Sequence, residues 1–222
     1  MQQLMDQESC LTCLFRAQLR FLGLKSDQQD TDKLERVMEY FDLGERVQPF
    51  RMAVISDTHA NLDPRVAEVV ARCDAVVHAG DICAAAVIDE LHELNKKVIA
   101  IAGNNDHAAL WPIEDASVVN NLPAIAKISA PGGLIVVEHG HRFGNHPAHS
   151  ELREAYPDAR MVIYGHTHKQ VWDAAGDTWV LNPGAAGFIR NHGGPACVVL
   201  TLTSIDWDVE LIQFSESHGQ AA

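Results

Sequence analysis

The stretch Met52-Ala53-Val54-Ile55-Ser56-Asp57-Thr58-His59 decides the fold, because an apolar run ends abruptly in two side chains that bind metals well. A short apolar run of this kind is typical of a buried β-strand. A carboxylate and an imidazole directly behind it are ligands that suit Mn, Fe, Zn or Ni ions. The stretch therefore predicts a strand that carries metal ligands at its carboxyl end.

The same arrangement recurs four times further along the chain. The blocks that follow apolar runs are Gly80-Asp81, Gly103-Asn104-Asn105-Asp106, His139-Gly140-His141 and Gly165-His166-Thr167-His168. Each block by itself is more often an ordinary polar turn, but five blocks in this order favour a single site, since ligands of open α/β sheets bind at the carboxyl ends of strands. Their glycines permit sharp turns and close backbone approach.

These blocks contain more metal ligands than one ion needs. The seven ligand-type residues are Asp57, His59, Asp81, Asn104, His139, His166 and His168. Seven ligands are too many for one tetrahedral ion and suit two ions that share a bridge. The pattern thus predicts metal-assisted hydrolysis, and a phosphate ester is the favoured substrate class.

The elements around the blocks predict an α/β fold. Strands at 52–56, 75–79 and 97–102 alternate with a helix that begins at Asp63-Pro64 and one that spans 84–94, an order that favours parallel pairing. The second half is richer in strands, expected at 124–129, 134–138, 161–164, 170–173, 178–181, 197–203 and 209–214, with one helix at 147–156. About ten strands exceed one compact sheet, so we expect two packed sheets.

Residues 1–50 have a different pattern and predict an N-terminal helical hairpin. Leu11, Leu14 and Leu22 recur at helical spacing. A second helix is expected from an Asp32 cap to Gly44, and its apolar stripe consists of Leu34, Val37, Met38 and Phe41. We divide the chain into this extension and a second domain, residues 51–222. The apolar face of the hairpin must pack on something, and we expect it to form a homodimer.

Over residues 51–214, the blocks D-x-H, G-D, G-N-x-D, H-G-H and G-H-x-H resemble those of the calcineurin-like metallophosphoesterase superfamily. The short spacings resemble its compact bacterial and archaeal phosphodiesterase branch, which also includes the retromer scaffold subunit. The resemblance implies an α/β fold of four layers, α/β/β/α, in which two sheets form a sandwich around a dinuclear metal centre. A non-catalytic scaffold on this fold is the alternative, but the complete ligand set favours an enzyme.

The resemblance also assigns roles to the ligands. Asp57, His59 and His168 would hold one divalent ion, whereas Asn104, His139 and His166 would hold the other. Asp81 would bridge the two ions, of which Mn²⁺ is the first choice and Fe, Zn or Ni are alternatives. A hydroxide between the ions would attack phosphorus in line with the leaving oxygen.

Three further residues are catalytic candidates. Many members of the superfamily have a histidine after the ligand Asn, thought to protonate the leaving group, whereas this chain has Asn105, which cannot act as a general acid near neutral pH. We therefore expect a phosphodiesterase that prefers good leaving groups. Asp106 could orient ligands or loop backbone, and His141 could contact the substrate.

Composition limits the partners. The 222 residues carry a formal charge of −13, which argues against a broad nucleic-acid or anionic-membrane surface. A small phosphate ester remains possible as substrate, because bound metal ions set the local field. Five cysteines without regular spacing favour a reducing compartment, and no apolar run is long enough for a membrane span. We expect a cytoplasmic protein.

Overall fold

The apolar run at the start of the α/β region forms strand β2, Phe50–Ile55, whose side chains alternate between two hydrophobic cores. Met52 and Val54 lie in the core between the two sheets. Ala53 and Ile55 lie in a second core, which includes residues of the helices. The strand is apolar at nearly every position because both of its faces are buried.

The computed structural model describes residues 38–44, 48–188 and 190–216. The other strands are β1 (Met38–Asp42), β3 (Ala75–His78), β4 (Val98–Ala100), β5 (Ile125–Ala130), β6 (Gly133–Glu138), β7 (Met161–Ile163), β8 (Gln170–Asp173), β9 (Trp179–Pro183), β10 (Ala196–Leu202) and β11 (Trp207–Gln213). The helices are α3 (Pro64–Val70), α4 (Ala85–Leu94), α5 (Ala116–Val119) and α6 (His149–Ala155), with short 3-10 helices at Ile113–Asp115 and His141–Phe143.

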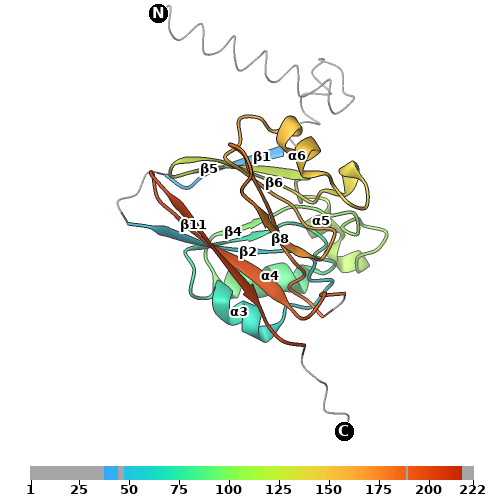
Figure 1. The fold of residues 1–222 in the computed structure, drawn as a ribbon. Helices are drawn as coiled ribbons and strands as arrows, with labels where there is room; N and C mark the ends of the chain where they lie inside the picture. The colour runs from blue at the N-terminus through green and yellow to red at the C-terminus, as the bar shows by residue number, and fades with distance from the viewer. Residues whose placement is uncertain (1–37, 45–47, 189, 217–222) are drawn as a thin grey trace, which may run out of the picture. The chain divides into compact units, whose positions relative to one another are not determined.

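The strands form two sheets (Figure 1). One has the order β11-β10-β2-β3-β4, and the other has the order β1-β5-β6-β7-β9-β8. In the first sheet β2, β3 and β4 are parallel neighbours, as the βαβαβ order predicted. In the second sheet β6, β7 and β9 are parallel neighbours. Both the α/β class and the expectation of two sheets are confirmed.

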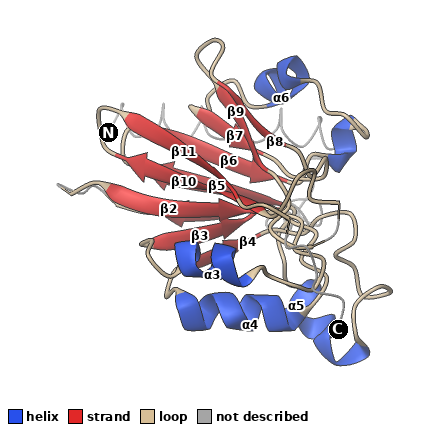
Figure 2. Cartoon of the chain, turned by 60° about the horizontal axis from the view of Figure 1, so that its bottom comes forward, coloured by secondary structure: helices blue, strands red, loops and turns tan. Residues whose placement is uncertain are grey.

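Helices cover the outer faces of the sandwich. Val66 and Val70 of α3 and Leu91 of α4 pack in one core with Ile55 and Val76 of the five-stranded sheet. In Figure 2, α3 and α4 lie side by side on this sheet, and α6 lies beyond the six-stranded sheet. Helix α6 is fixed there by a hydrogen bond from Arg153 Nε to the Thr178 carbonyl, 2.9 Å. The structure thus has the four layers that the family resemblance implied.

The predicted start of α3 is also confirmed. Asp63 is the N-cap, and its side chain accepts a hydrogen bond from the Arg65 amide at 2.9 Å. Pro64 follows at the first helical position, where the missing amide proton costs nothing.

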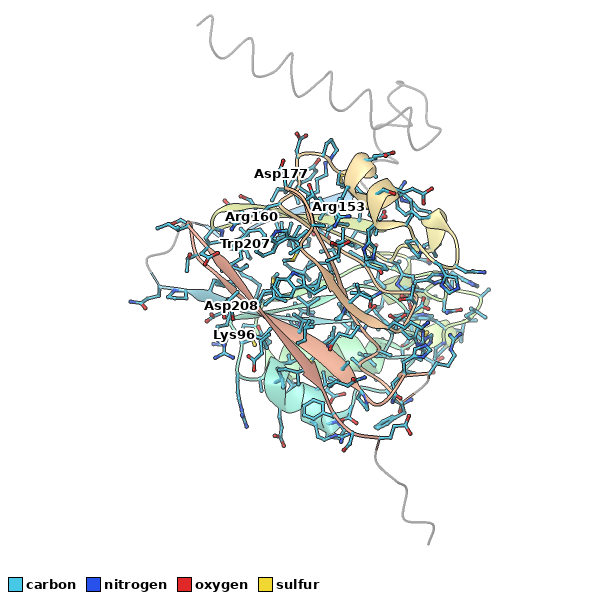
Figure 3. The ribbon with its side chains drawn as sticks, viewed as in Figure 1. Lys96, Arg153, Arg160, Asp177, Trp207 and Asp208 are labelled. Atoms are coloured by element: carbon cyan, nitrogen blue, oxygen red, sulfur yellow. The ribbon has the colours of Figure 1, made fainter. Side chains whose placement is uncertain are left out.

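An arginine and two tryptophans join the sheets at the amino end of β7. The guanidinium carbon of Arg160 lies 4.3 Å from the ring centroid of Trp207 and 5.7 Å from that of Trp179. Trp207 Nε1 donates to the Pro131 carbonyl at 2.7 Å. Figure 3 shows Arg160 and Trp207 close together at this edge. The carboxyl ends of the parallel strands, at the opposite end, are left for the polar blocks.

The expected helix around Asp32–Gly44 is wrong for residues 38–42, which form β1 beside β5 in the six-stranded sheet. Leu43 N donates to the Ser129 carbonyl at 2.9 Å, and Lys127 Nζ lies 5.7 Å from the ring centroid of Tyr40. The backbone of β5 offers pairing partners, and aromatic residues such as Tyr40 and Phe41 favour a strand once such partners exist. Tertiary pairing therefore overrides the helical spacing.

The chain divides into two units, residues 1–38 and 39–222. The remainder of the expected helical hairpin lies outside the described residues. Within the described part of the chain, none of the helices has the length and apolar character needed to cross a membrane.

Candidate metal centre

The polar blocks meet where the carboxyl ends of five strands, three from one sheet and two from the other, come together. The amide of His166, after β7, donates to Asp57 Oδ2, after β2, at 3.1 Å. His139, after β6, donates its Nδ1 proton to the Ala79 carbonyl, after β3, at 2.8 Å. Because a carbonyl only accepts, this bond fixes the tautomer and leaves His139 Nε2 available for a metal.

Four of the predicted ligands form one compact cluster. Asp57, His59, Asp81 and His168 each offer a ligand atom, and these atoms all lie within 4.8 Å of one another. The Nε2 atoms of His59 and His168 are 3.1 Å apart, and His168 Nε2 is 3.4 Å from Asp57 Oδ1. The structure therefore brings together the ligand set of the first ion and the residue expected to bridge.

Asp81 lies between this cluster and the second predicted set. Its Oδ2 is 3.9 Å from His59 Nε2, and its Oδ1 is 3.3 Å from His139 Nε2. The ring centroids of His139 and His166 are 5.3 Å apart. Asn104 is exposed on the turn that follows β4, directly before Asn105, which hydrogen-bonds Asp81. The two carboxylate oxygens of Asp81 thus face different imidazoles, as a bridging ligand would.

Two buried polar atoms of the site have no hydrogen-bond partner among the described residues: Asp57 Oδ1 and His139 Nε2, which lie 3.9 Å apart. An unsatisfied buried polar atom costs about 1–3 kcal/mol and is rare outside functional sites. A divalent cation would satisfy both atoms, since carboxylate oxygens and imidazole nitrogens are its ordinary ligands. The donor set therefore fits divalent metal ions.

The charges in the metal-free site shift its pKa values strongly. Burial raises the pKa of Asp57 to about 7, although the imidazole of His139 opposes this shift. Burial would lower the pKa of His139, but the carboxylates of Asp81 and Asp57 outweigh it and raise the value to about 9. Burial would raise the pKa of Asp81, but the nearby imidazole of His139 and the hydrogen bonds from Asn105 outweigh it and lower the pKa.

Five of the predicted ligands have a strained, left-handed backbone conformation. Positive φ angles are found at Asp57 (54°), His59 (45°), Asp81 (55°), His166 (66°) and His168 (59°). Non-glycine residues seldom adopt this region, and such strain persists only where surrounding structure holds it, typically at functional sites. The strain concentrates on the predicted ligands, which supports their assignment to one site.

Two glycines allow the loops to approach closely. A Cβ atom on Gly80 would lie 2.7 Å from His139 Nδ1 and 2.8 Å from the Gly103 amide. A Cβ atom on Gly103 would collide with Asp81. Gly80 also has a φ of 95°. No larger side chain fits at either position without displacing a ligand loop.

Asn105 and Asp106, two of the catalytic candidates, hold the ligand loops. Asn105 Nδ2 donates to Asp81 Oδ2 at 2.6 Å, and its amide donates to Asp81 Oδ1 at 2.8 Å. Asp106 accepts hydrogen bonds from the amides of Ile82, Cys83 and Gly103 and from Trp111 Nε1, at 2.8–3.1 Å. The structure therefore places Asn105 on the bridging carboxylate and Asp106 on the loop backbone.

His141, the third candidate, lies beside the second ligand set. Its ring centroid is 5.6 Å from that of His139 and 6.2 Å from that of His166. Its pKa is lowered, first by desolvation in this crowded group and then by the charge of His139. His141 is thus positioned near the cluster and is exposed to solvent.

Arg190 is a site residue that the sequence pattern does not single out. Its Nη2 lies 3.5 Å from His168 Nε2. Burial lowers the pKa of His59 and the charge of Asp81 opposes this shift. The charge of Arg190 also lowers the pKa. The available signal was a basic residue in an acidic chain, shortly after the Asn182-Pro183-Gly184 turn that follows a strand.

Comparisons with known proteins identify the family. The model of the calcineurin-like phosphoesterase superfamily domain matches residues 50–204. Phosphodiesterase MJ0936 of Methanocaldococcus jannaschii is 29% identical over 143 residues, which cover 60% of this chain and 82% of that protein. Phosphodiesterase YfcE of Escherichia coli K12 is 30% identical over 170 residues, which cover 66% of this chain and 84% of that protein.

The fold is also similar to solved structures. Vacuolar protein sorting 29 of Cryptosporidium parvum aligns with a TM-score of 0.61 over 76% of this chain and 100% of that chain, at 19% sequence identity. At this identity the likeness concerns the fold alone. The family match over residues 50–204, which includes the cluster of metal-binding side chains, shows that the chain belongs to the calcineurin-like phosphoesterase superfamily, the class of phosphoester hydrolases that the sequence pattern predicted.

Proposed function

We propose that the chain is a phosphodiesterase that works with two divalent metal ions, of which Mn²⁺ is the first choice and Fe, Zn or Ni are alternatives. The observation that carries this proposal is the position of Asp81, whose two oxygens face His59 on one side and His139 on the other. One carboxylate between two imidazole groups suits a ligand shared by two neighbouring ions.

The chain's own residues divide into two ligand sets. Asp57, His59 and His168 would hold the first ion, and Asn104, His139 and His166 the second, with Asp81 shared. When bound, two ions in such a site would supply a nucleophile for in-line attack on phosphorus and would neutralise the charge that develops on the phosphate oxygens. The Ala79 carbonyl keeps the proton of His139 on Nδ1, and Asn105 holds Asp81 in place.

A preference for diesters with good leaving groups follows from Asn105. Its amide donates to Asp81 and has no acidic proton to give to a leaving oxygen. His141 is a nearby imidazole available for substrate contact, but its lowered pKa means that a smaller fraction of it carries a proton to donate at neutral pH. Esters whose leaving groups depart without protonation should therefore react fastest.

The substrate that fits this proposal is a small phosphate ester. The formal charge of −13 would repel a long polyanion outside the metal centre. A cytoplasmic location belongs to the same proposal, and it is supported by Cys73, Cys83 and Cys197, which are free thiols.

The test compares hydrolysis of bis-p-nitrophenyl phosphate and p-nitrophenyl phosphate with added Mn²⁺ and with a chelator. We expect cleavage that requires metal, favours the diester and falls by at least about 100-fold in Asp81→Asn. The matched control is Asp89→Asn, an exposed acid on α4, which should retain wild-type rates. Equal rates in the chelated and Mn²⁺-loaded protein would contradict the proposal.

A non-catalytic scaffold is the competing function on this fold. It predicts that the protein binds two ions by elemental analysis yet turns over neither ester with any of the four metals. The presence of all seven ligand-type residues favours the enzyme, because a scaffold does not need to keep every one of them.

A further inference from the structure

A pocket of about 400 Å³ lies beside the metal centre, in the loop between β9 and β10. Its lining residues are Phe188, Arg190, Asn191, His192, Pro195 and Glu216. The volume lies in the range of small-molecule sites, about 300–1,000 Å³. Neither the ligand sets nor the proposed hydrolysis makes use of it.

The loop that builds the pocket also packs on the first ligand loop. A Cβ atom on Gly187 would lie 2.8 Å from the Asn61 carbonyl and would collide with the Thr58 carbonyl. The Asp63 amide donates to the Ala186 carbonyl at 3.1 Å. Further along the chain, Arg190 Nη2 lies 3.5 Å from His168 Nε2. The pocket and the metal centre therefore share a wall, formed by Arg190.

Hydrogen bonds fix the other walls of the pocket. Asn191 Nδ2 donates to the Gly187 carbonyl at 3.3 Å, and Gln213 Nε2 donates to the His192 carbonyl at 3.2 Å. On the far side, the Phe214 amide donates to the Pro195 carbonyl at 2.8 Å. Arg65 Nη1 donates to the Ser215 carbonyl at 3.0 Å, which holds the segment that carries Glu216. Hydrogen bonds therefore hold the backbone segments that carry the lining residues.

The guanidinium of Arg190 is free to bind an anion when the metal centre is filled. A metal ion on His168 Nε2 would take the lone pair that Arg190 Nη2 faces. An exposed guanidinium beside the ions attracts negative charge, and it matches two phosphate oxygens in fork geometry. Arg190 is therefore suited to a phosphate that sits at the metal centre.

The remaining lining suits a planar group. Phe188 is 52% exposed although it stands in the pocket wall, so its ring is available to pack against a ligand. Flat aromatic groups stack on such rings more favourably than aliphatic groups of similar size. Glu216 and His192, which also line the pocket, can accept or donate hydrogen bonds.

We propose that Arg190 binds the phosphate of the substrate and that the adjoining pocket holds a planar aromatic substituent of the ester against Phe188. The proposal rests on the proposed function, because it assigns the substrate class of the same site. The substrate class is then a phosphate ester with an aryl or heteroaryl group near the phosphorus.

Binding rather than turnover is the primary test. The Mn²⁺-loaded protein is titrated by calorimetry with inorganic phosphate and with phenyl phosphate. Arg190→Gln should weaken both ligands by about 10- to 100-fold, the effect of losing hydrogen bonds to a charged group. Phe188→Ala should weaken phenyl phosphate by several-fold and leave inorganic phosphate unchanged. Arg190→Lys, which keeps the charge but not the fork, should recover part of the loss.

The controls are Arg72→Gln, an exposed arginine on the surface behind α3, and Ile205→Ala, an exposed apolar residue in the β10–β11 turn. Ile205 lies at the opposite end of these strands from Pro195 and Glu216. Both control variants should bind the two ligands as the wild type does, and all variants should bind the same amount of Mn²⁺.

The proposal is overturned if Arg190→Gln binds inorganic phosphate like the wild type, if Phe188→Ala weakens both ligands equally, or if the wild type binds neither ligand. Failure of the proposed function gives a different result. In that case the binding pattern of the two variants is as expected, while the wild type hydrolyses no diester. The subsite would then belong to a phosphate-ester-binding protein.

Discussion

At the scale of single residues, Asp81 determines how the metal centre is organised. Its oxygens accept hydrogen bonds from the Asn105 side chain and amide while they face His59 and His139. Four groups therefore depend on one carboxylate in left-handed backbone, with a φ of 55°. A change in any of its neighbours acts on both ions through the position of Asp81.

Asn105→Ala tests that dependence. Loss of the 2.6 Å hydrogen bond frees one oxygen of Asp81 to rotate, so we expect Mn²⁺ affinity to fall by about 10- to 100-fold. Isothermal titration with Mn²⁺ measures the change, and Asn120→Ala, an exposed asparagine behind α5, is the control. Unchanged Mn²⁺ affinity in Asn105→Ala would show that Asp81 is held by its other partners alone.

Metal binding should release protons, because the metal-free site holds them tightly. His139, with a pKa raised to about 9, and Asp57, with a pKa raised to about 7, must both lose protons before they bind an ion. Apparent Mn²⁺ affinity should therefore rise with pH, steeply below about pH 7, more gently up to about pH 9, and not beyond. Each released proton contributes about tenfold per pH unit.

Calorimetry in buffers of different protonation enthalpy counts these protons directly. At pH 7 the expected release is between one and two protons for each chain that is filled. No dependence of the heat on the buffer would mean that the ligands are already deprotonated in the metal-free chain.

At the scale of elements, the loops after the strands are joined by Asp106. Its carboxylate connects the loop after β3, through Ile82 and Cys83, to the turn after β4, through Gly103. Trp111 Nε1 binds the same carboxylate at 3.1 Å. Three segments that belong to different elements are therefore fixed by one side chain that contributes no ligand atom to the cluster.

Asp106→Asn replaces one acceptor oxygen by a donor that faces backbone amides. We expect a loss of about 1–3 kcal/mol in the free energy of unfolding and weaker Mn²⁺ binding, since Asp81 lies next to Ile82. Urea unfolding of the metal-free protein and a Mn²⁺ titration measure the two effects. Asp89→Asn is the matched control, and a wild-type unfolding midpoint for Asp106→Asn would refute the linking role.

At the scale of the whole molecule, the sequence of the first 37 residues predicts the oligomeric state. Their apolar residues at helical spacing still predict association with a second copy of the chain. Sedimentation equilibrium of the full chain should give a dimer, and a chain that lacks residues 1–37 but keeps β1 should give a monomer. A monomeric full chain at micromolar concentration would defeat this prediction.

The sequence by itself determined the class of fold and the seven candidate ligands. The apolar runs, such as Met52–Ile55, are long enough for buried strands only, and each ends at a polar block. Parallel strands place their carboxyl ends together, so the order of blocks along the chain was enough to predict one site. The N-cap at Asp63 was equally local and equally predictable.

Only the tertiary structure decided the features that depend on contacts between distant segments. Residues 38–42 became a strand because β5 offered a free edge, against their helical spacing. Asn105 hydrogen-bonds Asp81, and Arg190 lies beside His168. No sequence pattern predicts that these pairs of loops come together. Strand ends and helix caps depend on residues that are neighbours in the sequence, whereas these contacts depend on which backbone and which charge the fold brings within hydrogen-bond distance.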